Sequence, residues 1–461
     1  MRSLVIVHMI VRKFKNNTLY LLSKMLRQFT NIRARDVVKC IQVVVTIILL
    51  VYLGTVHLHG FFSAKEKEFI EQRSEAETSS PYKQESLEKY KQHMAKQEET
   101  KTMTTKAPPI IDKDVLRRND TTPELTEKLP FLPDYKSPCW KELDEVLGPE
   151  VKINCLPYFY VVGVSQCGTK DLFERLTQHP LISGNMKAGN RWFTRLRFGG
   201  FPLLSDYLQY YYHAVETDIK RITTNDGYHN AIFGDFTPST IWDNHFLQSA
   251  ARKKNVTDPP YTNADVIKHL NPNARIIVLL CDPLERLFSD YIQIAEDFEA
   301  PPLVDEFHDH VVNAMTRFSN CLKNNTYLSC VYFGKPSSSY RAAGLSRIEI
   351  GLYHTHLANF MKVFPKNHML IISKEMLDKD SAKILQKIFD FLDVGPIKDP
   401  IVWQHITSFR NTEHSRPIGD MKPETRKLIQ DFYYPHNSRL AKLIGQDFNY
   451  NKNTSSQRRL K

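Results

Sequence analysis

Residues 157–170 read PYFYVVGVSQCGTK, and this stretch decides the fold class. Its first seven residues are apolar, favour β structure and end in glycine, which predicts a buried strand. The loop Ser165–Lys170 follows, and the amphipathic run 171–177 (DLFERLT) after it predicts a helix. The same order recurs at 274–286, where ARIIVLL leads into CDPLER and a helix that extends to about Glu296. We therefore predict a strand, a loop and a helix at both places.

A third apolar run, residues 368–373 (HMLIIS), lies between helices predicted at 351–364 and 380–392. Aliphatic runs that alternate with helices are typical of a parallel sheet covered on both faces. The sequence thus predicts an α/β domain over residues 135–450, with a central parallel sheet flanked by helices. The runs contain no internal repeat.

The segment 41–62 (IQVVVTIILLVYLGTVHLHGFF) contains no Asp, Glu, Lys or Arg and is long enough to cross a bilayer. Residues 1–40 carry nine Lys or Arg against one acid, so the positive-inside rule predicts a cytosolic N-terminus. We predict a single-pass type II membrane protein with a basic cytosolic tail and a signal anchor. A cleaved signal peptide is the alternative, but the run begins late, and Lys65 and Glu66 follow it instead of a small-residue cleavage site.

Residues 63–134 are rich in Lys, Glu, Gln, Ser and Thr, which predicts a luminal stem, and residues 451–461 form a C-terminal tail. The formal net charge of +11 indicates an anionic partner. A luminal domain disfavours nucleic acid as this partner and leaves a phosphorylated cofactor or an acidic glycan.

Seven cysteines fit a secretory compartment, because Cys40 lies at the membrane edge and the other six lie on the oxidising side. Two pairs close short loops and are plausible disulfides: Cys139 with Cys155, and Cys321 with Cys330. Sequence alone cannot fix connectivity.

Cys167 and Cys281 lie within the two loops described above, and we predict them to be buried thiols. Four luminal Asn-x-Ser/Thr triplets agree with glycosylation in the secretory pathway, and they begin at Asn119, Asn255, Asn324 and Asn453.

The loop after the first strand has the form of a phosphate cradle, in which backbone N–H groups, a helix N-terminus and the Thr169 hydroxyl face an anion. The Walker A order is absent, and an ordinary strand-to-helix turn is the alternative. The second loop places Arg286 and Ser289 three residues apart on the first turns of a helix. Two such edges can hold two phosphates.

These loops resemble the 5′- and 3′-phosphate sites of sulfotransferases that use 3′-phosphoadenosine 5′-phosphosulfate (PAPS). Over about 136–450 the chain resembles the carbohydrate sulfotransferase family, and within it the N-acetylgalactosamine 4-sulfate 6-O-sulfotransferases. The stretches that carry this likeness are 192–199 (WFTRLRFG), 234–243 (GDFTPSTIWD), 320–321 with 330–332 (NC, CVY), 351–353 (GLY) and 431–437 (DFYYPHN).

The resemblance implies a P-loop-like sulfotransferase fold, a Golgi location and PAPS as co-substrate. It also implies a sulfated galactosaminoglycan acceptor of the chondroitin or dermatan sulfate type. No metal is expected, since no metal-ligand spacing appears among the histidines and luminal cysteines. The cofactor-binding residues that it implies are Ser165, Gln166, Cys167, Gly168, Thr169, Lys170, Arg286 and Ser289.

Three positions depart from the family pattern. The lysine that contacts the bridging oxygen of the leaving group reads Gln166, which carries no charge to stabilise that oxygen. The arginine before Asp-Pro reads Cys281, and a thiol cannot replace a bidentate guanidinium. The glutamate that serves as general base reads Gly189.

Gln166, Lys170 and Asp235 are the candidate catalytic residues, and a histidine is an alternative base. Lys170 at the helix start could reach the phosphates in place of a loop lysine, or be merely solvated. A basic cluster suits an acidic glycan, with a solvated face as the alternative: Lys187, Arg191, Arg195 and Arg197.

We carry three hypotheses forward. The first is an active sulfotransferase, the second is a catalytically impaired relative that binds nucleotide or glycan as a scaffold or lectin-like module, and the third is a nucleotide kinase. The sequence leaves homo-oligomerisation open.

Overall fold

The structure, a computed structural model, describes residues 129–143, 151–201, 203–253, 255–298, 301–333, 346–408 and 420–452. The predicted cytosolic tail, the membrane anchor and nearly all of the stem and C-terminal tail lie outside these residues. Within the described ranges, no helix has both the length and the hydropathy to span a membrane.

A four-stranded sheet forms the centre of the described domain, in the order β4-β3-β5-β6. Its strands are β3 (Phe159–Gly163), β4 (Gly234–Asp235), β5 (Arg275–Leu280) and β6 (Met369–Ser373). Every pairing is parallel. β3 is buried throughout, and only the first residue of β5 is partly exposed, which agrees with strands covered on both faces. The predicted α/β domain with a parallel sheet is confirmed.

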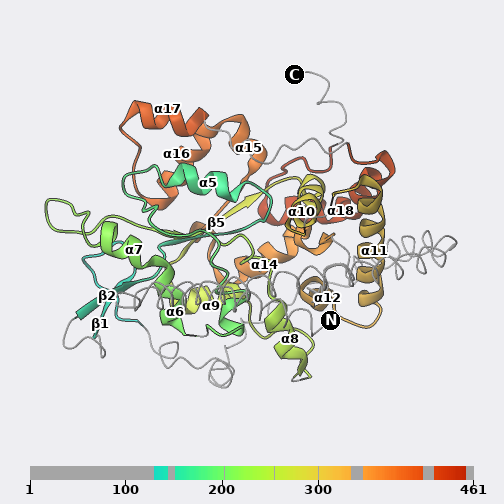
Figure 1. The fold of residues 1–461 in the computed structure, drawn as a ribbon, viewed down its shortest axis with the longest axis horizontal. Coiled ribbons are helices and arrows are strands. Elements are labelled where there is room, and N and C mark those ends of the chain that lie inside the picture. Colours follow the sequence, from blue (N-terminus) through green and yellow to red (C-terminus); the bar gives the residue numbers. More distant parts are fainter. Residues whose placement is uncertain are drawn as a thin grey trace, which may run out of the picture. The chain divides into compact units, whose positions relative to one another are not determined.

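Helices cover both faces of this sheet. Figure 1 shows α5, α15, α16 and α17 on one side of the strands and α9 and α14 on the other. The helices around the sheet are α5 (Thr169–Leu176), α6 (Leu204–Leu208), α7 (Tyr212–Ala214), α8 (His245–Lys253), α9 (Asn263–Leu270), α14 (Tyr353–Val363), α15 (Lys374–Lys379), α16 (Ser381–Leu392) and α17 (Pro400–Ser408). Short 3-10 turns lie at Leu196–Phe198, Gln209–Tyr211, Ile348–Gly351 and Lys366–His368, and a π turn lies at Val215–Ile219.

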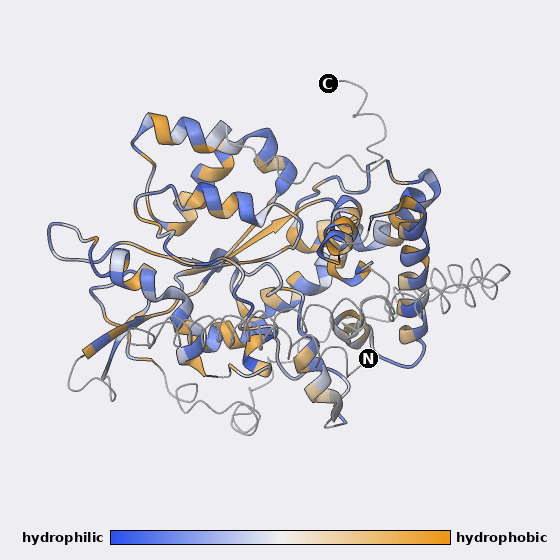
Figure 2. Cartoon of the chain, viewed as in Figure 1, coloured by the Kyte–Doolittle hydropathy of each residue, from blue (hydrophilic) through white to orange (hydrophobic). Residues whose placement is uncertain are grey.

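A second hydrophobic core lies among α10 (Pro283–Asp297), α11 (Val304–Leu322), α12 (Tyr327–Phe333) and α18 (Pro423–Ile444). Their inward faces supply Leu287, Phe307, Phe318 and Phe432, all nearly fully buried. Figure 2 shows that hydrophobic and hydrophilic residues alternate along the helices, as in amphipathic helices, whereas the central strands are hydrophobic. This core fixes α10, which follows β5 directly.

Both disulfides that the sequence favoured are formed. Cys139 and Cys155 are register partners at one end of the antiparallel hairpin β1 (Cys139–Leu143) and β2 (Val151–Cys155), and they are bonded. The Cys321–Cys330 bond joins the end of α11 to α12.

Candidate functional site

The loop between β3 and α5 forms one edge of the site. Gly163 ends the strand, and a Cβ there would lie 2.4 Å from Ile241 Cγ2, so only glycine fits. Gly168 caps α5 with φ +86°, a left-handed conformation that glycine adopts without steric cost. The loop can therefore present backbone N–H groups next to the beginning of a helix.

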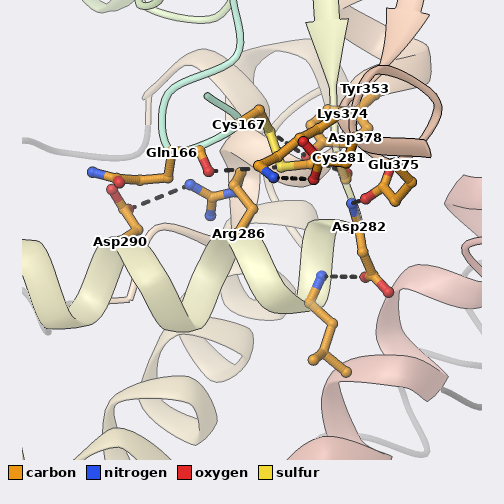
Figure 3. The surroundings of a disulfide bond; sticks show 11 residues. Gln166, Cys167, Cys281, Asp282, Arg286, Asp290, Tyr353, Lys374, Glu375 and Asp378 are labelled. Atoms are coloured by element: carbon orange, nitrogen blue, oxygen red, sulfur yellow. Dashed lines mark hydrogen bonds and ion pairs between the residues drawn. A yellow bond between two sulfur atoms is a disulfide. The ribbon is translucent and has the colours of Figure 1, made fainter. Parts of the chain in front are cut away.

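A disulfide between Cys167 and Cys281 joins this loop to the end of β5 (Figure 3). The prediction of two buried thiols is therefore wrong. β3 and β5 are adjacent parallel strands, so the residues after them leave the sheet at the same edge, and the two Cα atoms are 5.3 Å apart. The Tyr353 hydroxyl supports the junction by donating to the Cys281 carbonyl at 3.0 Å. The cysteine at position 281 thus ties the two predicted phosphate loops together.

The second edge begins with Asp282, the N-cap of α10. Its carboxylate accepts a hydrogen bond from Leu284 N at 2.9 Å, and its own N–H donates to Glu375 Oε1 at 2.9 Å. Burial raises the pKa of Asp282 to about 6. Ser289 lies two turns along the same helix, is exposed and lines the cleft described below.

Arg286 is a structural residue rather than a cofactor contact. Its side chain is fully buried and pairs with the equally buried Asp290 at 3.4 Å (Figure 3). The prediction that Arg286 binds cofactor is not supported, because α10 turns this side chain into the protein interior and it does not line the cleft.

Arg347, which no motif marked, supplies a guanidinium in the cleft instead. Its Nε donates to Asp290 Oδ2 at 2.8 Å, its Nη2 bonds Asp290 Oδ1, and its guanidinium lies over the Trp242 ring at 5.5 Å. Burial alone would raise the pKa of Asp290, but the guanidinium groups of Arg347 and Arg286 outweigh it and hold this pKa below its usual value. Asp290 therefore fixes the position of the Arg347 side chain, which is partly exposed and lines the cleft.

Residues from both edges line one cleft of about 1280 Å³. Two of its lining residues, Arg347 and Lys374, were missed by sequence reasoning. Lys374 could have been found from its position directly after the strand β6. Arg347 lies outside any strand or helix, so its position in the sequence does not mark it. The predicted residues that line it are Ser165, Gln166, Gly168, Thr169, Lys170, Ser289, Arg191 and Arg195.

The basic cluster divides into two parts. Arg191 and Arg195 line the cleft, and Arg195 pairs with Asp243 at 2.9 Å. Arg197 is buried, donates to the Phe193 carbonyl and stacks on Phe198, so it holds the core instead. Lys187 is exposed and lies outside the residues that line the cleft.

Asp235, a predicted catalytic residue, also lies outside the cleft lining. It is buried at the end of β4 and accepts hydrogen bonds from the Tyr207 hydroxyl at 2.8 Å and from Asn190 Nδ2 at 3.2 Å. Burial, and then the charge of Asp235, raise the pKa of Tyr207 and of Tyr211. Because its side chain is enclosed by these partners, Asp235 orders the core behind the cleft.

The chain belongs to the sulfotransferase family. The sulfotransferase domain matches residues 157–424, which is more than half of the chain. This confirms the prediction of a sulfotransferase.

Two curated relatives are named carbohydrate sulfotransferase 15. The Homo sapiens protein is 31% identical over 325 residues, covering 67% of this chain and 57% of that protein. The Rattus norvegicus protein is 28% identical over 386 residues, covering 78% of this chain and 68% of that protein. The solved sulfotransferase from Alicyclobacillus acidocaldarius is 18% identical with a TM-score of 0.43, covering 65% of this chain and all of that one. The predicted resemblance to the carbohydrate sulfotransferases is confirmed.

Proposed function

We propose that the protein transfers the sulfuryl group of PAPS to a hydroxyl group of a glycan. The observation that carries this proposal is that Ser289 and every residue of the loop Ser165–Lys170 except the buried Cys167 line one cleft, after two neighbouring parallel strands. Ligands of open α/β sheets bind outside the carboxyl ends of the strands. The relatives named carbohydrate sulfotransferase 15 support a sugar as the acceptor.

In this reaction the acceptor oxygen bonds to sulfur while the bond from sulfur to the 5′-phosphate oxygen breaks. The hydroxyl proton passes to a base, and 3′-phosphoadenosine 5′-phosphate (PAP) departs with the additional negative charge. No covalent enzyme intermediate is needed, so catalysis depends on positioning and on electrostatic stabilisation of the departing phosphate. The loop backbone and Thr169 suit the 5′ end of the nucleotide, and Ser289 with Arg347 suits the 3′-phosphate.

The charge of the cleft supports an anionic acceptor as well as an anionic co-substrate. Seven cationic side chains and four carboxylates line it, an excess of three positive charges. Gly189, Arg191 and Arg195 all line the cleft, and a Cβ on Gly189 would meet nothing within 4 Å, so the cleft has room at this residue. We assign this part of the cleft to the acceptor, and we propose a sulfated galactosaminoglycan of the chondroitin or dermatan sulfate type.

We further propose that the protein is a single-pass type II protein of the Golgi membrane with its domain in the lumen. The apolar segment 41–62 and the basic residues before it support this topology. Three disulfides favour an oxidising compartment. Asn255 and Asn324 are both exposed, as glycosylated residues must be. Protease protection of the domain in sealed microsomes would test the topology, and complete digestion without detergent would refute it.

The experiment that tests the activity uses the full-length chain in two steps. Titration calorimetry with PAP measures nucleotide binding, and transfer of radiolabelled sulfate from PAPS to chondroitin sulfate measures the reaction, with heparan sulfate as the matched acceptor control. Binding with transfer to chondroitin sulfate is expected. Binding without transfer to either glycan would indicate the catalytically impaired scaffold, and no PAP binding would refute the nucleotide site itself.

A further inference from the structure

Lys374 is the first residue of α15, and the fold brings it to the same sheet edge as the two phosphate loops. β6 pairs in parallel with β5, so the chain leaves β6 beside the point where it leaves β5. The Ser373 hydroxyl caps α15 by accepting from Met376 N at 3.2 Å. The next residue, Glu375, accepts the Asp282 N–H, which holds the start of α15 against the second loop.

The side chain of Lys374 lies along the first loop. A Cβ built on Gly168 would meet Lys374 Cε at 3.5 Å and Cδ at 3.6 Å, so the aliphatic part of the lysine lies next to the loop residue that has no side chain. Lys374 lines the cleft together with Ser165 and Thr169. Figure 3 shows it with Asp378 in the surroundings of the disulfide that joins the two loops.

A nearby cation would strengthen the binding of an anion in this loop, and the loop supplies few charges of its own. Ser165, Gln166 and Thr169 are neutral, and the side chain of Lys170 is 58% exposed and 4.0 Å from Glu174. Lys374 pairs with Asp378, and these side chains are 41% and 49% exposed. Such solvent-exposed pairs contribute little stability, so a phosphate group can displace the carboxylate at low cost.

We propose that Lys374 is a catalytic residue that binds the 5′-phosphosulfate with its Nζ and replaces the lysine that the loop lacks at Gln166. This inference rests on the proposed function. As the acceptor oxygen bonds to sulfur and the bond from sulfur to the phosphate oxygen breaks, the 5′-phosphate gains one negative charge. The ammonium group of Lys374 stabilises that charge while the hydroxyl proton leaves to a base.

The test compares five versions of the full-length chain: wild type, Lys374→Ala, Lys374→Ala with Gln166→Lys, Lys170→Ala, and Lys383→Ala as the matched control. Lys383 is an exposed lysine on the neighbouring helix α16, outside the residues that line the cleft. We expect Lys374→Ala to weaken PAP binding by about ten- to hundredfold, the loss expected for a charged hydrogen bond. Its rate of sulfate transfer should fall as well, because the negative charge on the 5′-phosphate grows as the bond from sulfur to the phosphate oxygen breaks. Gln166→Lys should restore part of both, and Lys383→Ala should match the wild type.

Two results would overturn the assignment. One is PAP affinity and transfer in Lys374→Ala within twofold of the wild type, particularly if Lys170→Ala loses both. The other is a loss that Gln166→Lys does not reverse even in part, which would indicate a structural role for Lys374. Both results presuppose a wild type that binds PAP, so they are distinguishable from failure of the proposed function, in which the wild type itself does not bind.

Discussion

The disulfide between Cys167 and Cys281 offers the sharpest test of the site architecture. Replacing both cysteines with alanine removes the covalent link between the loop after β3 and the end of β5. Both side chains are almost completely buried, so alanine is a better choice than serine, which would bury unsatisfied hydroxyl groups. The sheet pairing of β3 and β5 remains in the variant.

The expected loss of stability follows from the length of chain that the bond closes. The two cysteines are 114 residues apart, and the chain-entropy relation gives about 5 kcal/mol for a loop of this size. The Cys321–Cys330 bond spans 9 residues, and the same relation gives about 2.5 kcal/mol. Removing the first bond should therefore cost roughly twice as much free energy of unfolding as removing the second.

Urea denaturation of the double-alanine variants measures this difference, and PAP titration measures its consequence for the site. Cys167→Ala with Cys281→Ala should weaken PAP binding, because the two loops lose their fixed separation. Cys321→Ala with Cys330→Ala, which lies on α11 and α12, should bind PAP as the wild type does. Equal losses of stability in the two variants, or unchanged PAP affinity in the first, would refute the view that this bond organises the cleft.

Three further substitutions test the second edge. Ser289→Ala should weaken PAP binding by about 1 kcal/mol, measured by calorimetry, and an unchanged Kd would mean that the 3′-phosphate binds elsewhere. Asp282→Asn should raise the free energy of unfolding near pH 7 by up to about 3 kcal/mol, because burial raises the pKa of Asp282 to about 6 and asparagine keeps the cap without the charge. This gain should disappear below about pH 4, where the carboxyl is protonated in both states, and a gain that persists there contradicts the argument. Asp290→Asn should lower the free energy of unfolding by about 3 kcal/mol above pH 4, because Arg347 and Arg286 lose their buried partner. That loss of stability should shrink as the pH falls through the lowered pKa of Asp290. Urea denaturation at several pH values measures it, and a loss that stays constant with pH would contradict the argument.

The local sequence predicted the main strands and helices well, because the burial of each segment is reflected in its pattern of apolar residues. The run ARIIVLL is aliphatic at every position except Arg275, as expected of a strand covered on both faces, and residues 275–280 form β5. The helix expected at 351–364 is α14, and the one expected at 380–392 is α16, while the short helix α15 before it was not predicted. With only six residues, α15 is too short to show a helical period.

Side-chain placement was predicted less well. Arg286, Arg197 and Asp235 are charged, and charge in a motif suggested contact with a ligand. Each instead finds a buried partner: Asp290, the Phe193 carbonyl and the Tyr207 hydroxyl. A buried charge is stable only when it is paired in this way, and the partner cannot be read from spacing along the chain.

The alternation of strands and helices could be predicted from the amino-acid sequence, and so could two plausible short-range disulfides. The sequence also placed Ser165–Lys170 directly after one strand and Ser289 on the helix that follows another. The bond between Cys167 and Cys281, and the places of Arg347 and Lys374 in the cleft, became visible in the folded chain alone. This difference arises because hydrophobic periodicity specifies which face of a segment is buried. Which distant segments then meet depends on the order of the strands in the sheet, and a parallel sheet brings residues far apart in sequence to one edge.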